Sequence, residues 1–253
     1  MKNGLIHVRD WIEWYLLEKL LPFWIQNAPD SQGGFLTYFD RYGKPTGEIT
    51  KTFLMQIRSL YTFSSAHRAG YGDGECAELA KHGADFILEH YWDDKYGGWY
   101  WIADLNGNPF VLDKIGYGQC FAVYAFSEYY LATGDERGKI AVKNTYTAIS
   151  ENMIDTRYGG YYEIMTRDWQ PLPGERSGGN RKSMDVHMHM MEALTTLYEM
   201  THSDIHRRRL LECIDLIVSK MLDPLTGTGG IQFSLDFTPL PAILFDVKWG
   251  RDA

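Results

Sequence analysis

Apolar residues recur at intervals of three and four positions along most of the chain, as they do in helices that bury one face. Glycine, proline and short polar runs interrupt this spacing and mark where helices stop. The pattern predicts seven helices, over residues 7–26, 51–69, 75–91, 117–132, 135–153, 182–200 and 205–221. We therefore expect an all-α protein.

The segments between these helices contain an internal repeat that begins with a glycine pair. The second glycines of the four pairs, Gly34, Gly98, Gly160 and Gly230, lie 64, 62 and 70 residues apart. A short aromatic run and then turn residues follow each pair, and this order is typical of a β-hairpin. The sequence thus predicts small β-hairpins between helices, with a period of about 65 residues.

Each repeating unit is a helical hairpin that must bury its apolar face against neighbouring units. Such an array, with β-hairpins between the helices, resembles the (α/α)6 toroid of sugar-acting enzymes, in which six inner helices surround a pocket. Six units would need roughly 390 residues, whereas the chain has 253 residues. We expect one domain over residues 1–253 that forms an incomplete toroid, with about four of the six hairpin units.

An incomplete ring would expose the apolar flanks of its first and last units. We therefore expect the chain to self-associate through this open edge. If the sequence is a fragment of a longer gene product, the rest of that product would cover the flanks instead.

Charge and composition narrow the range of partners. The formal net charge is −8, with 45% hydrophobic and 23% charged residues, which argues against binding to nucleic acid or to an anionic membrane. The N-terminal segment lacks the uninterrupted apolar core of a signal peptide, and the uncharged stretch 115–127 is too short to span a bilayer. We expect a cytoplasmic protein with three reduced core thiols, Cys76, Cys120 and Cys213.

Four blocks of the sequence resemble blocks of one enzyme family, in the same order along the chain. They are MQIRSLYTFSSAHR (55–68), KIGYGQCFAVYAFSEYYLATGD (114–135), YGGYYEIMTRDWQPL (158–172) and KSMDVHMHMMEALTTLYEM (182–200). The family is that of N-acylglucosamine 2-epimerase, and the likeness is greatest to its cellobiose 2-epimerase branch. The resemblance implies epimerisation at C2 of an aldose, or aldose–ketose isomerisation, on a mono- or disaccharide and without a metal or another cofactor. In this chemistry a base removes the C2 proton of the ring-opened sugar, and the resulting enediol is then reprotonated.

The resemblance also assigns roles to individual residues. Arg58 matches the family's arginine that hydrogen-bonds the developing oxyanion, and a guanidinium suits this role because it stays cationic and offers several donors. His189 resembles the family's pocket histidine, so we predict Arg58 and His189 as catalytic residues. Tyr117 matches a tyrosine that lines the sugar pocket, and Asp185 and Glu192 share a helical face with His189. These three residues are predicted to bind substrate.

The last residues of the chain depart from the family pattern. Where family members carry a Gly-His-Asp-x-Glu block with one of two catalytic histidines, this sequence reads Gly250-Arg251-Asp252-Ala253. Arginine does not act as a base near neutral pH, so Trp249 and Arg251 are predicted only to bind substrate. The family's second catalytic histidine would lie beyond residue 253. We therefore also consider a catalytically inactive sugar-binding or vestigial protein.

Two further site chemistries are less favoured by the sequence. A glycoside hydrolase on the same fold would need two carboxylates about 5–9.5 Å apart, and Asp113, Glu163 and Asp185 show no evident pairing. His187 and His189 are two positions apart on a predicted helix, so their side chains diverge by about 200° and do not suggest a metal site. The aromatic residues after the glycine pairs either stack on a sugar or pack the hairpins.

Overall fold

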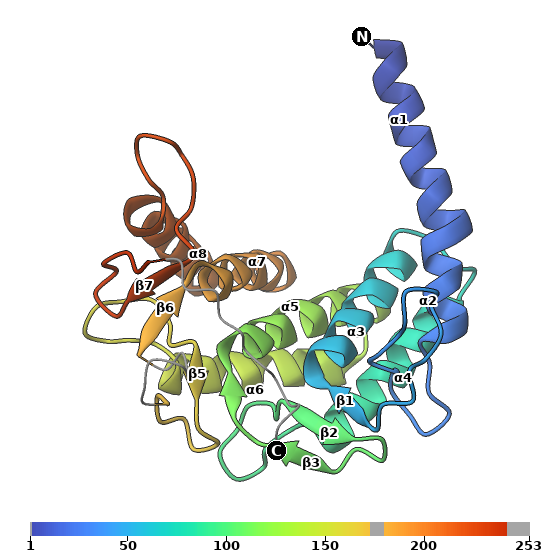
Figure 1. Cartoon of the computed structure of the whole chain (residues 1–253), viewed down its shortest axis with the longest axis horizontal. Helices are drawn as coiled ribbons and strands as arrows, with labels where there is room; N and C mark the ends of the chain where they lie inside the picture. The colour runs from blue at the N-terminus through green and yellow to red at the C-terminus, as the bar shows by residue number, and fades with distance from the viewer. Residues whose placement is uncertain (1, 173–179, 242–253) are drawn as a thin grey trace.

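The chain begins with a long helix that projects away from the rest of the molecule (Figure 1). In the computed structural model, which describes residues 2–172 and 180–241, this helix consists of α1 (Lys2–Tyr15), the π-helical turn η1 (Leu16–Leu20) and α2 (Leu21–Asn27). Pro22 has no N–H to donate to the preceding turn, which accounts for the wide π turn just before it.

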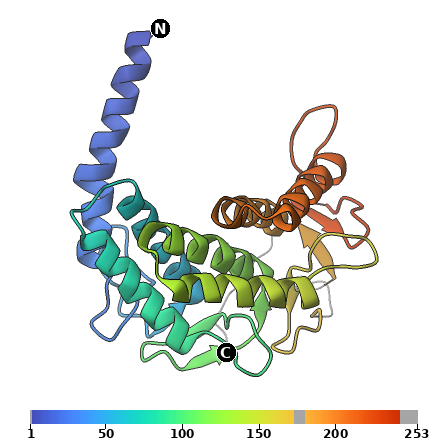
Figure 2. The same ribbon diagram turned by 180° about the vertical axis from the view of Figure 1, so that it is seen from behind.

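The remaining helices of the described residues form two layers (Figures 1 and 2). The inner layer consists of α3 (Phe53–Arg68), α5 (Gly116–Thr133) and α7 (Met184–Thr201). The outer layer consists of α4 (Glu75–His90), α6 (Glu136–Asn152) and α8 (Asp204–Leu216), which continues as the π turn η2 (Ile217–Met221). Helix α5 packs against both α3 and α7, and each inner helix packs against the outer helix that follows it. The predicted all-α array of helical hairpins is confirmed.

Short strands connect consecutive helical hairpins to one another. They are β1 (Thr50–Thr52), β2 (Ile102–Asp104), β3 (Pro109–Val111), β4 (Lys114–Ile115), β5 (Ile164–Met165), β6 (Arg181–Ser183) and β7 (Gln232–Ser234). The strand just before each inner helix pairs antiparallel with a strand that follows the next glycine pair, in the pairs β1–β2, β4–β5 and β6–β7. Strands β2 and β3 also form a local hairpin of the predicted kind. The turns were therefore predicted correctly, but the pairing between units was not.

Two residues that the apolar spacing placed in helices, Lys51 and Lys182, instead lie in β1 and β6. Their side chains, like that of Lys114 in β4, are fully buried, and each forms an ion pair with an aspartate that follows the preceding outer-layer or N-terminal helix. The pairs are Lys51–Asp30 at 2.9 Å, Lys114–Asp93 at 3.0 Å and Lys182–Asp155 at 2.8 Å. Because a buried ammonium group needs a carboxylate or carbonyl partner, each lysine fixes the strand just ahead of an inner helix.

Five positions after each buried lysine, an inner-helix side chain holds the backbone that follows the glycine pair. Gln56 accepts a hydrogen bond from Phe35 N–H at 2.7 Å and donates to the Phe35 carbonyl at 2.6 Å. Gln119 makes the same two bonds with Trp99, at 3.0 and 2.9 Å. A planar amide suits this position because it offers a donor and an acceptor side by side.

In the third unit, His187 takes the place of the glutamine. Its Nε2 accepts a hydrogen bond from Tyr161 N–H at 3.1 Å, and its Nδ1 donates to the Ser183 carbonyl at 2.8 Å. These two bonds specify the neutral tautomer with the proton on Nδ1. His187 is therefore part of the hairpin contact, on the other side of the helix from His189.

The second glycine of each of the first three pairs is required by its conformation and by its surroundings. Gly98 has a φ of 75°, in the left-handed region, and a Cβ atom there would lie 2.4 Å from Trp169 Cζ2. Gly160 has a φ of 73°, and a Cβ atom there would lie 2.5 Å from His187 Nε2. A side chain at either position would be both strained and overlapping, which explains why the glycines recur.

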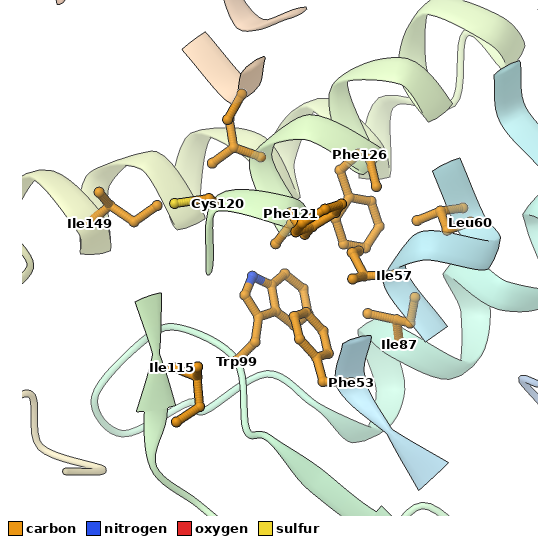
Figure 3. Packing of buried hydrophobic residues seen from close by; sticks show 14 of the residues in the cluster. Phe53, Ile57, Leu60, Ile87, Trp99, Ile115, Cys120, Phe121, Phe126 and Ile149 are labelled. Carbon is orange, nitrogen blue, oxygen red and sulfur yellow. The ribbon is translucent and has the colours of Figure 1, made fainter. Parts of the chain in front are cut away.

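The aromatic residue after each of the first three glycine pairs is buried, and Figure 3 shows Trp99 packed into the core between the layers. Trp99 stacks on Phe53 and Phe126, with ring centres 5.6 and 5.3 Å apart, and its Nε1 donates a hydrogen bond to Thr145 Oγ1 at 2.8 Å. Tyr161, at the same position of the next unit, is also buried. The hairpin aromatics at this position pack the protein interior. The three cysteines of the sequence are free and buried as well.

Candidate functional site

The three inner helices present equivalent positions to one side of the layer. Each helix carries a side chain of the site seven residues after its buried lysine: Arg58 on α3, Phe121 on α5 and His189 on α7. Tyr117 and Asp185 lie one turn earlier, at the position three residues after the lysine. Because neighbouring inner helices pack side by side, residues at the same level come into contact.

Arg58 rests on two aromatic rings of α5. Its guanidinium carbon lies 4.8 Å from the centre of the Phe121 ring and 5.9 Å from that of Tyr117. The residue is nevertheless exposed. A guanidinium held over aromatic faces keeps its charge and N–H edge available to a ligand, as the predicted oxyanion role requires.

His189 is held by the same two rings and by a carboxylate. Its imidazole lies 4.6 Å from the Tyr117 ring centre, edge to face, and 4.7 Å from that of Phe121. Nδ1 is 2.6 Å from Glu192 Oε2, one turn along α7, and the His189 side chain is only 12% exposed. Because a carboxylate accepts hydrogen bonds, this contact places a proton on Nδ1 and leaves the Nε2 lone pair to accept one.

Tyr117 connects the charged residues of the cluster. Burial raises the pKa of its hydroxyl, the Arg58 charge lowers it, and the charges of Asp185 and Glu192 raise it further. The hydroxyl therefore stays protonated near neutral pH and is available as a hydrogen-bond donor. Asp185 itself is exposed at the first turn of α7. The structure thus brings Arg58, Tyr117, Asp185, His189 and Glu192 together, and we refer to these residues with Phe121 as the inner-face cluster.

Phe121 was not identified from the sequence, although a signal for it exists. It stands at the same distance from Lys114 as Arg58 does from Lys51, so an alignment of the three units would have found it. Tyr61 and Tyr124, one turn further along α3 and α5, were missed as well. Their rings stack with centres 4.1 Å apart, and they extend the aromatic surface next to the cluster.

An ionic contact joins the three inner helices beyond the cluster. Arg68, at the end of α3, lies 2.9 Å from Glu128 of α5 and also pairs with Glu199 of α7. The Glu128 side chain is almost completely buried. Since one guanidinium bonds to carboxylates of two neighbouring helices, this contact keeps the spacing of the inner layer on which the cluster depends.

The remaining predicted residues are placed differently. Trp249 and Arg251 lie outside the described residues, so both stay predictions. Asp113 is half-buried beside Lys114, and burial raises the pKa of its carboxyl. Glu163, by contrast, lies close enough to Asp185 for the two charges to interact, and the pKa of Glu163 is raised to about 7.

Within residues 2–172 and 180–241, no three histidine, cysteine, aspartate or glutamate side chains gather in a way that would hold a metal ion. No helix in this part of the chain combines the length and hydropathy needed to cross a membrane. A pocket of about 240 Å³ lies in the outer layer between α4 and α6, away from the inner-face cluster, and its lining includes Trp92, Arg137 and Asn144.

Solved structures share this arrangement of inner and outer helices. The cellobiose 2-epimerase of Spirochaeta thermophila matches with a TM-score of 0.86 and 28% identity, over 94% of this chain and 59% of that one. The cellobiose 2-epimerase of Bacillus thermoamylovorans matches with 0.84 and 27%, over 95% and 62%. An α-mannanase of Bacteroides thetaiotaomicron, with a TM-score of 0.67 and 14% identity, shares the fold alone. The fold class is therefore that of the (α/α)6 toroids.

Sequence comparison identifies the family within that class. The model of the N-acylglucosamine 2-epimerase family matches residues 33–246, and the chain belongs to this family. The cellobiose 2-epimerase of Bacteroides fragilis is 30% identical over 248 residues, which are 94% of this chain and 61% of that protein. The D-mannose isomerase of Marinomonas mediterranea is 24% identical over 199 residues, 77% of this chain and 48% of that protein. The chain thus spans less than two thirds of the length of these relatives.

Proposed function

We propose that the inner-face cluster binds a ring-opened aldose and moves the proton at C2, so that the chain acts as a sugar 2-epimerase or aldose–ketose isomerase. His189 Nε2 takes the C2 proton, and the electron pair moves toward the C1 oxygen. The Arg58 guanidinium donates hydrogen bonds to that oxygen as its negative charge develops. Tyr117, Asp185 and Glu192 hold the sugar hydroxyls and the imidazole.

The observation that carries this proposal is the contact of Arg58 and His189 with the same two aromatic rings. Three inner helices contribute to it, and the Glu192 carboxylate orients the imidazole with one nitrogen available to accept a proton. A base and an oxyanion donor on opposite sides of a ring-lined surface meet the geometric needs of enediol chemistry. The family membership supports a carbohydrate as the substrate.

The number of bases near C2 determines whether a ketose or a C2 epimer can form. Aldose–ketose isomerisation returns the proton to C1, and one base on one face of the enediol performs both transfers. Epimerisation requires a proton to reach C2 from the opposite face, so it needs a second donor or a rotation of the intermediate. Arg251 stands where the family resemblance calls for one of the two catalytic histidines. A catalytically inactive sugar-binding protein is therefore the second candidate.

Proton NMR of the purified chain in D2O tests the proposal. With glucose, mannose, N-acetylmannosamine and cellobiose as substrates, we expect loss of the C2 proton signal and growth of the ketose or of the C2 epimer. Sugar-dependent chemical shifts without any exchange at C2 would favour the binding protein. Absence of both exchange and binding in a folded sample contradicts the proposal.

We also propose that two copies of the chain associate through apolar faces at the two ends of the array. Trp11 and Ile12 on α1 are 59% and 54% exposed, and Ile205 and Val218 at the other end are both 59% exposed. The two faces belong to opposite ends of one chain (Figure 1). A second copy therefore offers each face an apolar partner of the kind that a larger ring would supply.

For the compartment, we propose the cytoplasm. The three free and buried thiols suit a reducing environment. Fractionation of cells that produce the protein is the direct test, and recovery outside the cytoplasmic fraction would contradict the proposal.

A further inference from the structure

Glu163 lies where the N-terminal ends of α5 and α7 meet, in the segment just before β5. Its backbone carbonyl accepts a hydrogen bond from Gly116 N–H at 2.7 Å, next to Tyr117. Its carboxyl is hydrogen-bonded to the side chain of Ser183, the N-cap residue of α7. Glu163 is therefore at the same end of the inner layer as Tyr117 and Asp185.

One oxygen of this carboxyl has no evident structural use. Oε2 of Glu163 is buried, and no group of the described residues hydrogen-bonds to it. The equivalent positions of the first two units, three residues after the second glycine, are Thr37 and Trp101. An acidic residue at this position is therefore not a feature of the repeat. A buried polar oxygen without a partner is costly to keep, and such atoms in native proteins call for an explanation, of which a catalytic role is one.

The groups around Glu163 favour its protonated form near neutral pH. Burial has the largest effect and raises the pKa of the carboxyl to about 7, and the negative charge of Asp185 on α7 adds to this rise. The positive charge of Arg181 on β6 and the hydrogen bond with Ser183 lower the pKa without outweighing burial. A half-buried acid beside an exposed aspartate is an arrangement in which one carboxyl gives a proton and the other takes one.

Asp185 connects Glu163 to the inner-face cluster. Its charge raises the pKa of Tyr117 as well as that of Glu163, so it acts on both residues. The Tyr117 ring in turn contacts His189 and Arg58. A sugar bound to the cluster with its C1 end toward the start of α7 would bring its ring oxygen and C1 hydroxyl to these two carboxyls.

We propose that Glu163 and Asp185 open the pyranose ring of the substrate before C2 is deprotonated. Glu163 gives its proton to the ring oxygen as the bond between that oxygen and C1 breaks. Asp185 takes the proton of the C1 hydroxyl as the C1 aldehyde forms. Ring closure reverses both transfers, so no other reactant is consumed. The inference rests on the proposed function for its substrate class, and it assigns a step that precedes the C2 chemistry.

Ring opening can be followed separately, because it also interconverts the α and β anomers of a sugar. Freshly dissolved α-D-glucose is mixed with the protein, and the anomer ratio is followed by NMR. We expect the chain to accelerate this interconversion and Glu163→Gln, which keeps the size of the side chain, to reduce the acceleration at least tenfold. Asp185→Asn should have a similar effect. Glu151→Gln, the same change at an exposed position of α6, is the matched control and should leave the rate unchanged.

The pH dependence of the unmodified chain provides a second measurement that does not require a variant to fold. The acceleration should fall as the pH rises through about 7, because Glu163 then loses the proton that it must give. A pH-independent acceleration, equal rates for Glu163→Gln and the unmodified chain, or no acceleration by folded protein would each overturn the inference. Acceleration of anomer interconversion without exchange at C2 would support it while rejecting the proposed epimerase or isomerase activity.

Discussion

At the scale of single residues, the direction of the polar atoms of Arg58 and His189 matters as well as their charge. In the proposed mechanism, Arg58 acts through the direction of its N–H groups as well as its charge, whereas His189 acts through one nitrogen of an imidazole that Glu192 orients. Charge alone is therefore a poor substitute at either position.

Conservative substitutions of Arg58 and His189 test whether the direction of their polar atoms matters in addition to charge. We expect Arg58→Lys, which keeps the charge but loses the fork of donors, to slow C2 exchange by about 10- to 100-fold. We expect His189→Gln to slow it by about 100-fold or more, because it removes the group proposed to take the C2 proton. Arg207→Lys, at an exposed position of α8, is the control. Exchange rates from NMR in D2O decide the matter, and unchanged rates in both cluster variants would remove the cluster from the mechanism.

His187 leads to a prediction about stability and pH. Burial lowers the pKa of its imidazole to about 4 in the folded protein, whereas it is about 6.5 in an unfolded chain. The unfolded state then binds the extra proton first, so the folded state loses stability as the pH falls from about 6.5 toward 4, by roughly 3 kcal/mol. We expect His187→Gln, which copies Gln56 and Gln119, to remove most of this loss.

Urea unfolding at a series of pH values between 4 and 7 measures the effect of His187. The exposed His7 provides the control, because His7→Gln should not alter the slope of stability against pH. An unchanged slope in His187→Gln would show that acid sensitivity has another source.

At the level of elements, the repeated lysine–aspartate pair holds each inner helix to the hairpin before it. The three pairs are not equivalent, because Asp93 also bonds to Arg167 Nε at 2.9 Å. When a partner is removed from a buried ion pair, the remaining charge is left uncompensated at a cost of about 3–5 kcal/mol. Because Arg167 is a second cation next to Asp93, removal of Lys114 should cost less than this.

This difference predicts an order of stability. We expect Lys182→Met to lower the free energy of unfolding by about 3–5 kcal/mol, since it leaves Asp155 buried without that ammonium. Lys114→Met should cost less, since Arg167 stays next to Asp93. Lys143→Met, at an exposed position of α6, should change little. Denaturant unfolding at neutral pH provides the comparison, and an equal loss in both buried variants would argue against the role of Arg167.

For the molecule as a whole, the exposed apolar residues at the two ends of the helical array are the basis of the association proposed above. The buried hydrophobic residues form one cluster that runs from Leu21 to Phe237, and we infer that the chain folds as one domain. Exposed apolar side chains lie outside that cluster on α1 and on α8 with η2, and others, such as Phe110, are exposed elsewhere on the molecule.

Association between copies should depend on both of these ends. We expect the molar mass from light scattering to rise with protein concentration toward that of a dimer. Trp11→Glu and Val218→Glu should each weaken association at least about tenfold, a change of about 1.4 kcal/mol. Phe110 is 52% exposed on β3, away from both ends, and Phe110→Glu serves as the control. A monomer at all concentrations contradicts the proposal.

The repeat and the helices were predictable because they depend on local spacing. A buried helical face requires apolar residues every three or four positions, and the second glycine of the first three pairs is required by its own backbone angle. For the same reason, helical spacing placed Asp185, His189 and Glu192 on one face and His187 on the other. The family resemblance added Arg58 and Tyr117; the Tyr117 ring contacts His189 on that face, and Arg58 lies over the Tyr117 ring.

The sequence by itself thus determined the class of the fold, its period and most of the residues of the inner-face cluster. The tertiary structure decided which contacts form between the repeating units. It showed which strands pair, that Lys51 and Lys182 are buried in strands, that Phe121 lies beneath Arg58, and that Glu163 is a half-buried acid whose carboxyl interacts with the charge of Asp185. These properties come from contacts between segments far apart in the sequence. Strand pairing, desolvation and charge interaction depend on the atoms that folding brings together. The spacing of residues within one segment does not predict which atoms these are.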